Sequence, residues 1–264
     1  MTPTIVLQDR PAPHVARLLI NRPDKRNAID LGVRQALTSA VAAIRDDSSV
    51  RALVFGGAEG MFSAGGDVPS MRDLDEAGAR ARMQHIAVLC RSVAALRIPV
   101  VSAVEGIGAG AAVGLALLGD HIVVGPGTRI LFPFLKLGLV PDWGQMLTLP
   151  RRVGVGAARR ILTAGEPVRG EEAHRIGLAD VLVPDAEVMA TAIEKASELA
   201  QLPMGAFARM KDRLTRVSAS LDAELQREED DQAFCLTADE FREGYDAFST
   251  KRTADFVNLP GAAR

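Results

Sequence analysis

The sequence predicts an α/β fold followed by a helical C-terminal part. Strand-plus-helix units follow one another along the first half, and their strands are continuous apolar runs. Such strands are typical of a parallel sheet that is covered on both faces. From about Trp143 onward, nearly every segment has helical periodicity. We therefore expect a core over residues 1–200 and a helical region over residues 201–264.

The first unit begins with two short strands, residues 4–7 and 15–20, joined by the turn-rich segment QDRPAPH. The polar segment RPDKRNA then leads into a helix over 31–45, with Asp30 as its N-cap. Further along, Pro99 separates a helix from a β-branched strand. The remaining expected strands are 51–57, 100–104, 121–125 and 129–132, and the remaining expected helices are 76–96, 111–118, 149–165, 170–177, 186–202, 205–217, 220–236 and 237–252.

Composition excludes several classes of protein. The chain has 264 residues, 31 Lys+Arg, 33 Asp+Glu and two cysteines. A net charge of −2 argues against nucleic acid as a partner, and the cysteine spacing supports neither a disulfide framework nor a zinc site. The apolar stretch 98–119 contains Glu105 and five glycines, which argues against a membrane span. The N-terminus shows no signal-peptide pattern, so we expect a cytoplasmic protein without a resident metal.

Two glycine-rich segments are candidates for ligand binding. FSAGGD (62–67) follows a predicted strand, and EGIGAGAAVG (105–114) opens a predicted helix. Free backbone amides in such segments can bind an anion or stabilise an oxyanion. An ordinary glycine-rich turn is the alternative for FSAGGD. The second segment also resembles a dinucleotide-binding turn, but its glycines have the spacing G-x-G-x-G instead of G-x-G-x-x-G.

Asp142 is the candidate acid or base. It lies in GLVPDWG, between apolar residues and a predicted helix. Desolvation there would raise its pKa, as proton transfer near neutral pH requires. A solvated helix cap is the alternative. The four histidines have no Ser or Cys partner in a nucleophile motif, so triad chemistry has little support.

These segments, in this order, resemble the crotonase (enoyl-CoA hydratase/isomerase) superfamily over essentially the whole chain. The resemblance is carried by NRPDKRNA, FSAGGD, the A-V-x-G turn, GLVPDWG with PRRVG after it, and the ending AFSTKR. It implies a ββα spiral core that binds a coenzyme A thioester, and a C-terminal region that assembles a homotrimer or a dimer of trimers. Coenzyme A would be part of the substrate, with no separate cofactor.

The resemblance also assigns roles to residues. The amides of Gly66 and Ala111 would stabilise an enolate oxygen, a contribution of about 3 to 4 kcal/mol for each donor. Asp142 matches the catalytic aspartate of dienoyl-CoA isomerases and of the isomerase of phenylacetate ring degradation. Phe134 and Trp143 would line the substrate-binding site and keep water out. The positions expected to bind coenzyme A are Arg26, Ala28, Ala64 and Asp67, together with Phe248 and Lys251, which in relatives reach coenzyme A on a neighbouring subunit.

Two departures from the family pattern direct the choice of reaction. Enoyl-CoA hydratases use two glutamates, and the register of the motifs puts Gly114 and Phe134 at their places. We therefore expect an enoyl-CoA isomerase with Asp142 as the sole acid and base, and a pocket that Gly114 enlarges. The alternatives are a hydratase or lyase with different acid and base groups, a non-catalytic acyl-CoA binder, and a nicotinamide-dependent enzyme.

Overall fold

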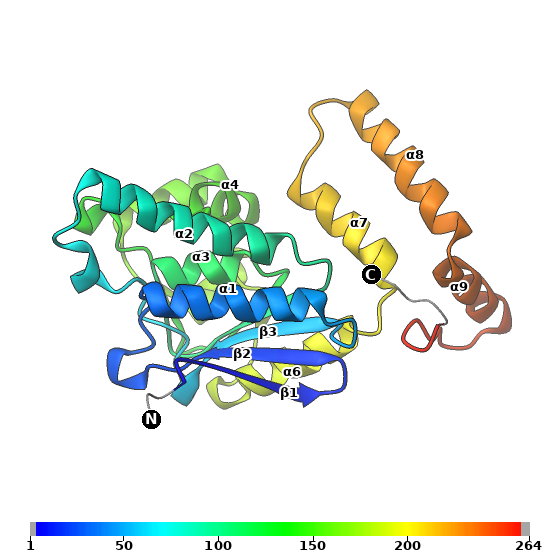
Figure 1. Ribbon diagram of the computed structural model, residues 1–264, viewed down its shortest axis with the longest axis horizontal. Coiled ribbons are helices and arrows are strands. Elements are labelled where there is room, and N and C mark those ends of the chain that lie inside the picture. Colours follow the sequence, from blue (N-terminus) through cyan, green and yellow to red (C-terminus); the bar gives the residue numbers. More distant parts are fainter. Residues whose placement is uncertain (1–3, 260–264) are drawn as a thin grey trace.

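The protein, described here over residues 4–259 of a computed structural model, is built around a six-stranded sheet in the order β1-β2-β3-β4-β6-β9 (Figure 1). Strands β1 and β2 are antiparallel and every later pairing in this sheet is parallel. A smaller sheet has the order β5-β7-β8. The strands are β1 (Val6–Ala12), β2 (Val15–Ile20), β3 (Ala52–Gly57), β4 (Val100–Val104), β5 (Ile107–Ala109), β6 (His121–Val124), β7 (Arg129–Leu131), β8 (Val168–Arg169) and β9 (Val181–Leu182).

Helices follow most of these strands, which confirms the α/β class. The N-cap expected at Asp30 is present, because its carboxylate accepts a hydrogen bond of 2.9 Å from the amide of Val33. The helices are α1 (Leu31–Asp46), α2 (Glu76–Ala94), α3 (Ala111–Leu117), α4 (Gln145–Ala164), α5 (Gly170–Arg175), α6 (Val188–Leu199), α7 (Met204–Thr215), α8 (Leu221–Thr237) and α9 (Asp239–Thr250).

Both faces of the large sheet are buried, as the apolar strands predict. In β3, Leu53 and Phe55 belong to a large core cluster that includes residues of α1, α2 and α3. Ala52 and Val54, which point the other way, belong to a second cluster with α6. Figure 1 shows the sheet between α1 and α6. Burial of alternate residues on opposite faces explains why β3 reads as an uninterrupted apolar run.

Several element boundaries differ from those expected. The segment QDRPAPH is mostly strand, because β1 continues to Ala12 and only Pro13 and His14 form the turn. Pro11 is tolerated because β1 is the edge strand of its sheet. Helix α4 begins four residues before the expected start, and it changes direction at Gly154, whose φ is 78°. The short strands β5, β8 and β9 were not expected, since two or three residues carry no readable period.

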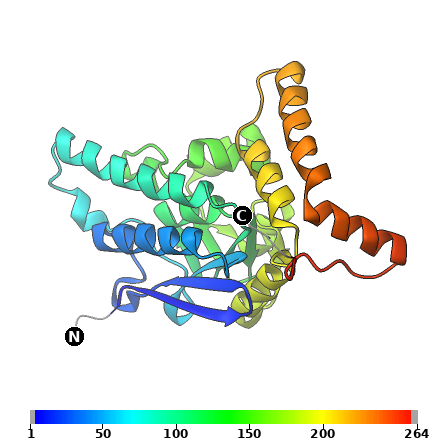
Figure 2. The same cartoon turned by 45° about the vertical axis from the view of Figure 1, so that its right-hand side comes forward.

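Helices α8 and α9 extend away from the rest of the molecule, as Figures 1 and 2 show from two directions. Helix α7 attaches them to the core. The ammonium group of Lys211 on α7 donates to the carbonyl oxygen of Ile98 at 3.0 Å and to the carboxylate of Asp120 at 2.6 Å. Only 7% of Lys211 is exposed, so this buried pair fixes α7 against the start of β4.

Among residues 4–259, no helix combines the length and the apolar character that crossing a membrane requires.

Candidate active site

Backbone hydrogen bonds hold three of the sequence motifs side by side. The amide of Ile29 donates to the carbonyl oxygen of Gly65 at 2.7 Å, and the amide of Ala64 donates to that of Arg26 at 2.9 Å. On the other side, the amide of Ala109 donates to the carbonyl oxygen of Ser63 at 3.1 Å. The segment around 26–29 and the β5 turn therefore flank FSAGGD, which lies between them.

Two fully buried polar side chains lock this arrangement. Asn27 has a φ of 55°, a conformation that asparagine tolerates better than most residues, and its amide donates to the carbonyl oxygens of Ala58 and Met61 at 3.0 and 2.6 Å. The hydroxyl of Ser63 donates to the carbonyl oxygen of Asn27 at 2.7 Å and accepts from the amide of Gly65 at 3.0 Å. The asparagine of the first motif and the serine of the second are thus structural partners.

A cavity of about 580 Å³ opens where these loops meet α2 and the segment 133–142. Most of the lining surface is apolar, and its charged members are two arginines and one aspartate. The lining residues are Ala64, Gly66, Val68, Pro69, Met71, Arg72, Arg82, Gly110, Ala111, Pro133, Phe134, Leu137, Leu139 and Asp142.

Gly66 and Ala111 both line this cavity, and their backbone amides have no acceptor within residues 4–259. Ala111 is the first residue of α3, where helical geometry provides no partner for the amide. Gly110, just before Ala111, has a φ of 49°. On the other loop, a Cβ atom at Gly65, the residue before Gly66, would collide with the carbonyl oxygen of Ala109. These glycines let the two loops approach closely enough for both amides to reach one cavity.

Asp142 also lines the cavity, and its Oδ1 atom is buried with no hydrogen-bond partner in the described part of the chain. Burial raises its pKa from 3.8 to about 6, although the positive charges of Arg82 and Arg34 oppose this rise. Apolar neighbours penalise the carboxylate more than the carboxylic acid. A carboxyl group with this pKa can both accept and return a proton near neutral pH.

The side chain of Gln145 anchors the backbone at Asp142. It is fully buried, and its side-chain nitrogen donates to the carbonyl oxygens of Gly110 and Asp142, both at 3.0 Å. One side chain therefore connects the glycine turn to the backbone of the acid. A glutamine in the first turn of a helix has no distinctive sequence pattern, so the role of Gln145 could not be predicted from the sequence.

Trp143 is buried behind Asp142 and is not among the lining residues of the cavity. Its backbone has a φ of 53°, which is unusual for an aromatic residue. It packs against α3 at Gly114, where an added Cβ atom would lie 2.3 Å from the Trp143 Cβ and 3.1 Å from the Gln145 Nε2 atom. The expectation that Gly114 enlarges the pocket is therefore wrong, because Trp143 fills that space.

The other expected binding residues lie in three places. Ala64 and Phe134 line the cavity, whereas Arg26, Ala28 and Asp67 lie in the neighbouring loops and do not. Phe248 and Lys251 are on and just after α9, outside this cavity. The ring of Phe248 is 84% exposed, and it borders a separate apolar hollow of about 380 Å³ with Tyr245 and other residues of the C-terminal region.

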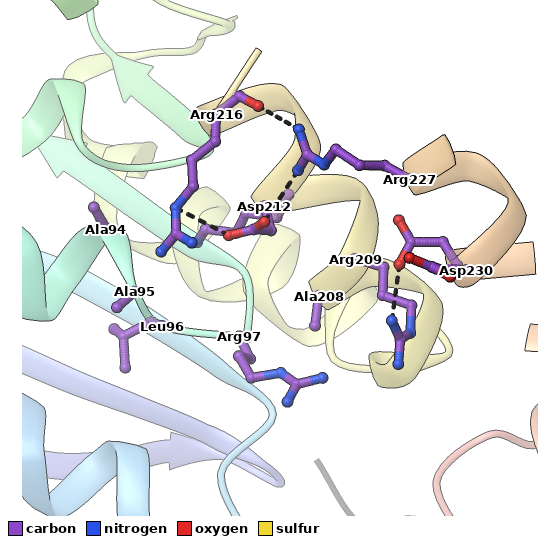
Figure 3. A pocket seen from close by; sticks show the side chains of 12 residues that line it. Ala94, Ala95, Leu96, Arg97, Ala208, Arg209, Asp212, Arg216, Arg227 and Asp230 are labelled. Atoms are coloured by element: carbon purple, nitrogen blue, oxygen red, sulfur yellow. Dashed lines mark hydrogen bonds and ion pairs between the residues drawn. The ribbon is translucent and has the colours of Figure 1, made fainter. Parts of the chain in front are cut away.

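A further cavity, of about 490 Å³, lies between residues 94–97 and helices α7 and α8 (Figure 3). Asp212 pairs with Arg227 at 3.2 Å and with Arg216 at 3.3 Å, and Arg209 pairs with Asp231 at 2.8 Å. These internal ion pairs satisfy most of its charge, so it is a weaker candidate for a ligand site. Residues 4–259 contain no cluster of three His, Cys, Asp or Glu side chains placed to hold a metal.

Comparison with known proteins identifies what the whole chain resembles. The sequence model for enoyl-CoA hydratase/isomerase matches residues 12–258. A 1,2-epoxyphenylacetyl-CoA isomerase of Escherichia coli K12 is 31% identical over 92% of this chain and 95% of its own. A crotonyl-CoA hydratase of Syntrophomonas wolfei is 30% identical over 92% and 95%. An enoyl-CoA hydratase structure from Bacillus anthracis superposes with a TM-score of 0.91 at 26% identity, over 97% of this chain and all of the other.

Proposed function

Because the chain belongs to the enoyl-CoA hydratase/isomerase family, we propose that it moves the double bond of an enoyl-CoA thioester, with Asp142 as the only acid and base. The observation that supports this proposal is that one carboxyl group and two backbone amides belong to residues that line the same cavity. Asp142 and the amide-bearing residues Gly66 and Ala111 all line it. A free carboxyl group and two free amides are the minimum that enolate chemistry requires.

The two amides act on the thioester carbonyl. When a proton leaves the carbon next to that carbonyl, negative charge moves to its oxygen, and the amides of Gly66 and Ala111 donate hydrogen bonds to it. Donors that are already in place stabilise this charge without reorganisation, and each contributes about 3 to 4 kcal/mol. Coenzyme A is part of the substrate, so the reaction needs no separate cofactor.

Asp142 carries the proton. Its carboxylate takes a proton from carbon 2 of a 3-enoyl thioester, and the electron pair of that C–H bond enters the dienolate. The resulting carboxylic acid then returns the proton to carbon 4, which leaves the 2-enoyl thioester and restores the carboxylate. Mass and charge balance over this cycle, and a single carboxyl group suffices for both transfers.

Two features favour isomerisation over hydration. A hydratase must hold and activate water with two carboxylates, whereas Asp142 is the only carboxylate among the lining residues of this cavity. Phe134 stands in the wall, where the family resemblance places the second glutamate of hydratases, and it is 94% buried. The apolar wall around the reacting carbons favours proton return over attack by water.

Assembly as a homotrimer or a dimer of trimers is part of the proposal. Phe241, Tyr245 and Phe248 lie at spacings of four and three residues along α9 and are 46%, 61% and 84% exposed. Such a stripe on one face of a helix is typical of an interface. Phe248 and Lys251 would then reach coenzyme A held by a neighbouring subunit.

The decisive experiment incubates the purified protein with a 3-enoyl-CoA and, separately, with a 2-enoyl-CoA, and follows products by mass and retention time. Interconversion at unchanged mass supports the isomerase. A gain of one water supports a hydratase or lyase instead. Binding of acyl-CoA without turnover of a broad thioester panel supports a non-catalytic binder, and stabilisation by NAD in place of coenzyme A contradicts the whole proposal.

A further inference from the structure

We propose that the acyl chain of the substrate carries a carboxylate, which pairs with the guanidinium group of Arg82 in the cavity wall, close to the buried guanidinium group of Arg34. This inference rests on the proposed function, since it names the substrate class of the same site. Arg34 and Arg82 belong to none of the sequence motifs described above.

Arg34 is a buried cation without a hydrogen-bonding partner. It lies on α1 between apolar core residues and is 4% exposed. Its Nε and Nη1 atoms are buried and donate to nothing within residues 4–259. Burial lowers its pKa, which is the direction expected when a charge loses water and gains no counter-ion. Leaving such a group unpaired is unfavourable, so a buried arginine normally has a carboxylate or several carbonyl oxygens around it.

Arg82 on α2 provides the second guanidinium. It lines the cavity, and its Nη2 atom lies 3.2 Å from the position that a Cβ atom on Gly66 would take. In the described part of the chain it forms neither an ion pair nor a hydrogen bond, and burial lowers its pKa as well. Its positive charge further lowers the pKa of Arg34, so the two cations are close enough to repel each other.

The protein's own acids do not neutralise this pair. Asp142 and Asp67 raise the pKa of Arg82, and Asp30 and Asp142 raise that of Arg34, but no carboxylate lies within 4.0 Å of either guanidinium in residues 4–259. Asp30 instead pairs with Arg22 at 3.0 Å. Asp142, with a pKa of about 6, is mostly ionised at pH 7, but its buried Oδ1 atom has no hydrogen-bond partner in residues 4–259. Arg72 and Arg82 outnumber Asp142 on the cavity lining, and Arg34 is buried nearby, so the site keeps a net positive charge even when Asp142 is ionised.

Three arginines around the second cavity have ion-pair partners within the protein. There, Arg209, Arg216 and Arg227 each pair with an aspartate at 2.8 to 3.3 Å (Figure 3). The contrast with Arg34 and Arg82 indicates that their missing partner comes with the ligand. Guanidinium groups bind carboxylates through paired, charge-assisted hydrogen bonds.

The position of the two arginines distinguishes the acyl chain from the phosphates of coenzyme A. Arg82 lies next to Gly66, and the positive charges of both arginines lower the pKa of Asp142. Under the proposed function, Gly66 and Asp142 mark the thioester carbonyl and the reacting carbons. The phosphates lie at the far end of the pantetheine arm from those atoms. An anion between α1 and α2 therefore belongs to the acyl chain.

The test measures binding of saturated thioesters, which cannot react. Calorimetry compares free coenzyme A, hexanoyl-CoA and adipoyl-CoA, with shorter and longer members of both series to allow for chain length. We expect the carboxylate series to bind about 10- to 100-fold more tightly than the methyl-terminated series at its best length. This preference should disappear in Arg82→Met and in Arg34→Met. It should persist in Arg80→Met, whose arginine lies on the same helix but is exposed and pairs with Glu76 at 2.9 Å.

A stability measurement separates a ligand-binding role from a structural one. Because Arg34 has no partner in the free protein, Arg34→Met should leave the Tm unchanged or raise it, while abolishing the extra stabilisation by adipoyl-CoA. A large fall in Tm without ligand would assign Arg34 to the fold and overturn the inference. Equal affinity for both series at every length would also overturn it and leave the isomerase proposal standing. Failure of every acyl-CoA to bind would contradict both.

Discussion

Gly114 and Trp143 occupy a single volume, because a Cβ atom on Gly114 would lie 2.3 Å from the Cβ atom of Trp143. Gly114 stands where the family resemblance places the first glutamate of hydratases. Trp143 follows Asp142 directly, so the residue that fills this space also fixes the start of α4 behind the acid. The packing at position 114 and the backbone next to Asp142 therefore depend on the same residue, Trp143.

Replacement of Gly114 should destabilise the fold. Gly114→Ala would force Trp143 or Gln145 to move, and overpacking of this kind costs about 1 to 3 kcal/mol. Urea denaturation measures the loss in free energy of unfolding. Gly156→Ala is the matched control, because the nearest atom to a Cβ there is the end of the Arg160 side chain at 3.7 Å. That helical substitution should be neutral or stabilise by about 0.5 to 1 kcal/mol. Equal effects of both variants would contradict the steric argument.

Loss of the acid should abolish turnover and spare binding. Asp142→Asn keeps the size of the side chain but cannot carry the proton, so isomerisation should slow by about 100- to 10,000-fold. The affinity for a saturated acyl-CoA should change little. Asp73→Asn, an exposed acid in the loop before α2, is the control and should keep full activity. Near-normal turnover by Asp142→Asn would rule out the proposed mechanism.

The pH dependence should report the raised pKa of Asp142. Since the reaction begins with the carboxylate, kcat/KM in the 3-enoyl to 2-enoyl direction should rise with pH and level off above a midpoint near 6. A profile that falls over this range would mean that the protonated acid acts first.

The contribution of Asp142 to stability should fall as pH rises, whereas kcat/KM should increase. Between its ordinary pKa of 3.8 and the folded value of about 6, Asp142 binds more protons in the native than in the unfolded state. Its contribution to the free energy of unfolding therefore falls as pH rises through this window. Asp142→Asn removes that penalty, so its Tm should exceed that of the parent at pH 8, and the difference should shrink toward pH 4. A difference that is independent of pH would contradict the raised pKa.

One amide of the proposed oxyanion site can be removed without shortening a helix. Proline is accepted at the first position of a helix, which Ala111 occupies, and it has no N–H. Ala111→Pro should lower kcat by about 100- to 1,000-fold. Circular dichroism should stay near that of the parent, whereas acyl-CoA affinity should also fall, because the proline Cδ atom lies where the N–H would meet the thioester oxygen. Retention of kcat in a folded variant would show that the amide of Ala111 does not reach the thioester oxygen.

The exposed aromatic face of α9 should control assembly. Light scattering at micromolar concentration should give three or six times the chain mass of 28.1 kDa. The double substitution Tyr245→Glu and Phe248→Glu should shift the protein toward monomer, because it places charges in an apolar interface. Asp246→Asn, between them in the sequence, should leave the mass unchanged. A monomeric parent would contradict trimer-based assembly.

Local patterns predicted much of the fold, and the reason differs between elements. The helix from Leu31 was correctly expected because Asp30 is an N-cap with apolar residues at helical spacing behind it. Strand β1 was placed wrongly because its polar, proline-containing sequence is tolerated only at a sheet edge, and edge position is a property of the whole sheet. Strands β5, β8 and β9 are too short for any periodicity, and only their neighbours define them.

By itself, the sequence determined the class of fold, the motif order and the family, because glycine turns, caps and apolar runs act over a few residues. It also singled out Asp142, Gly66 and Ala111, which share one cavity. Only the tertiary structure decided that Trp143 fills the space beside Gly114 and that Arg34 and Arg82 form no ion pair within residues 4–259. Packing and charge neutrality depend on residues that are distant in the chain, so neither can be read from local sequence.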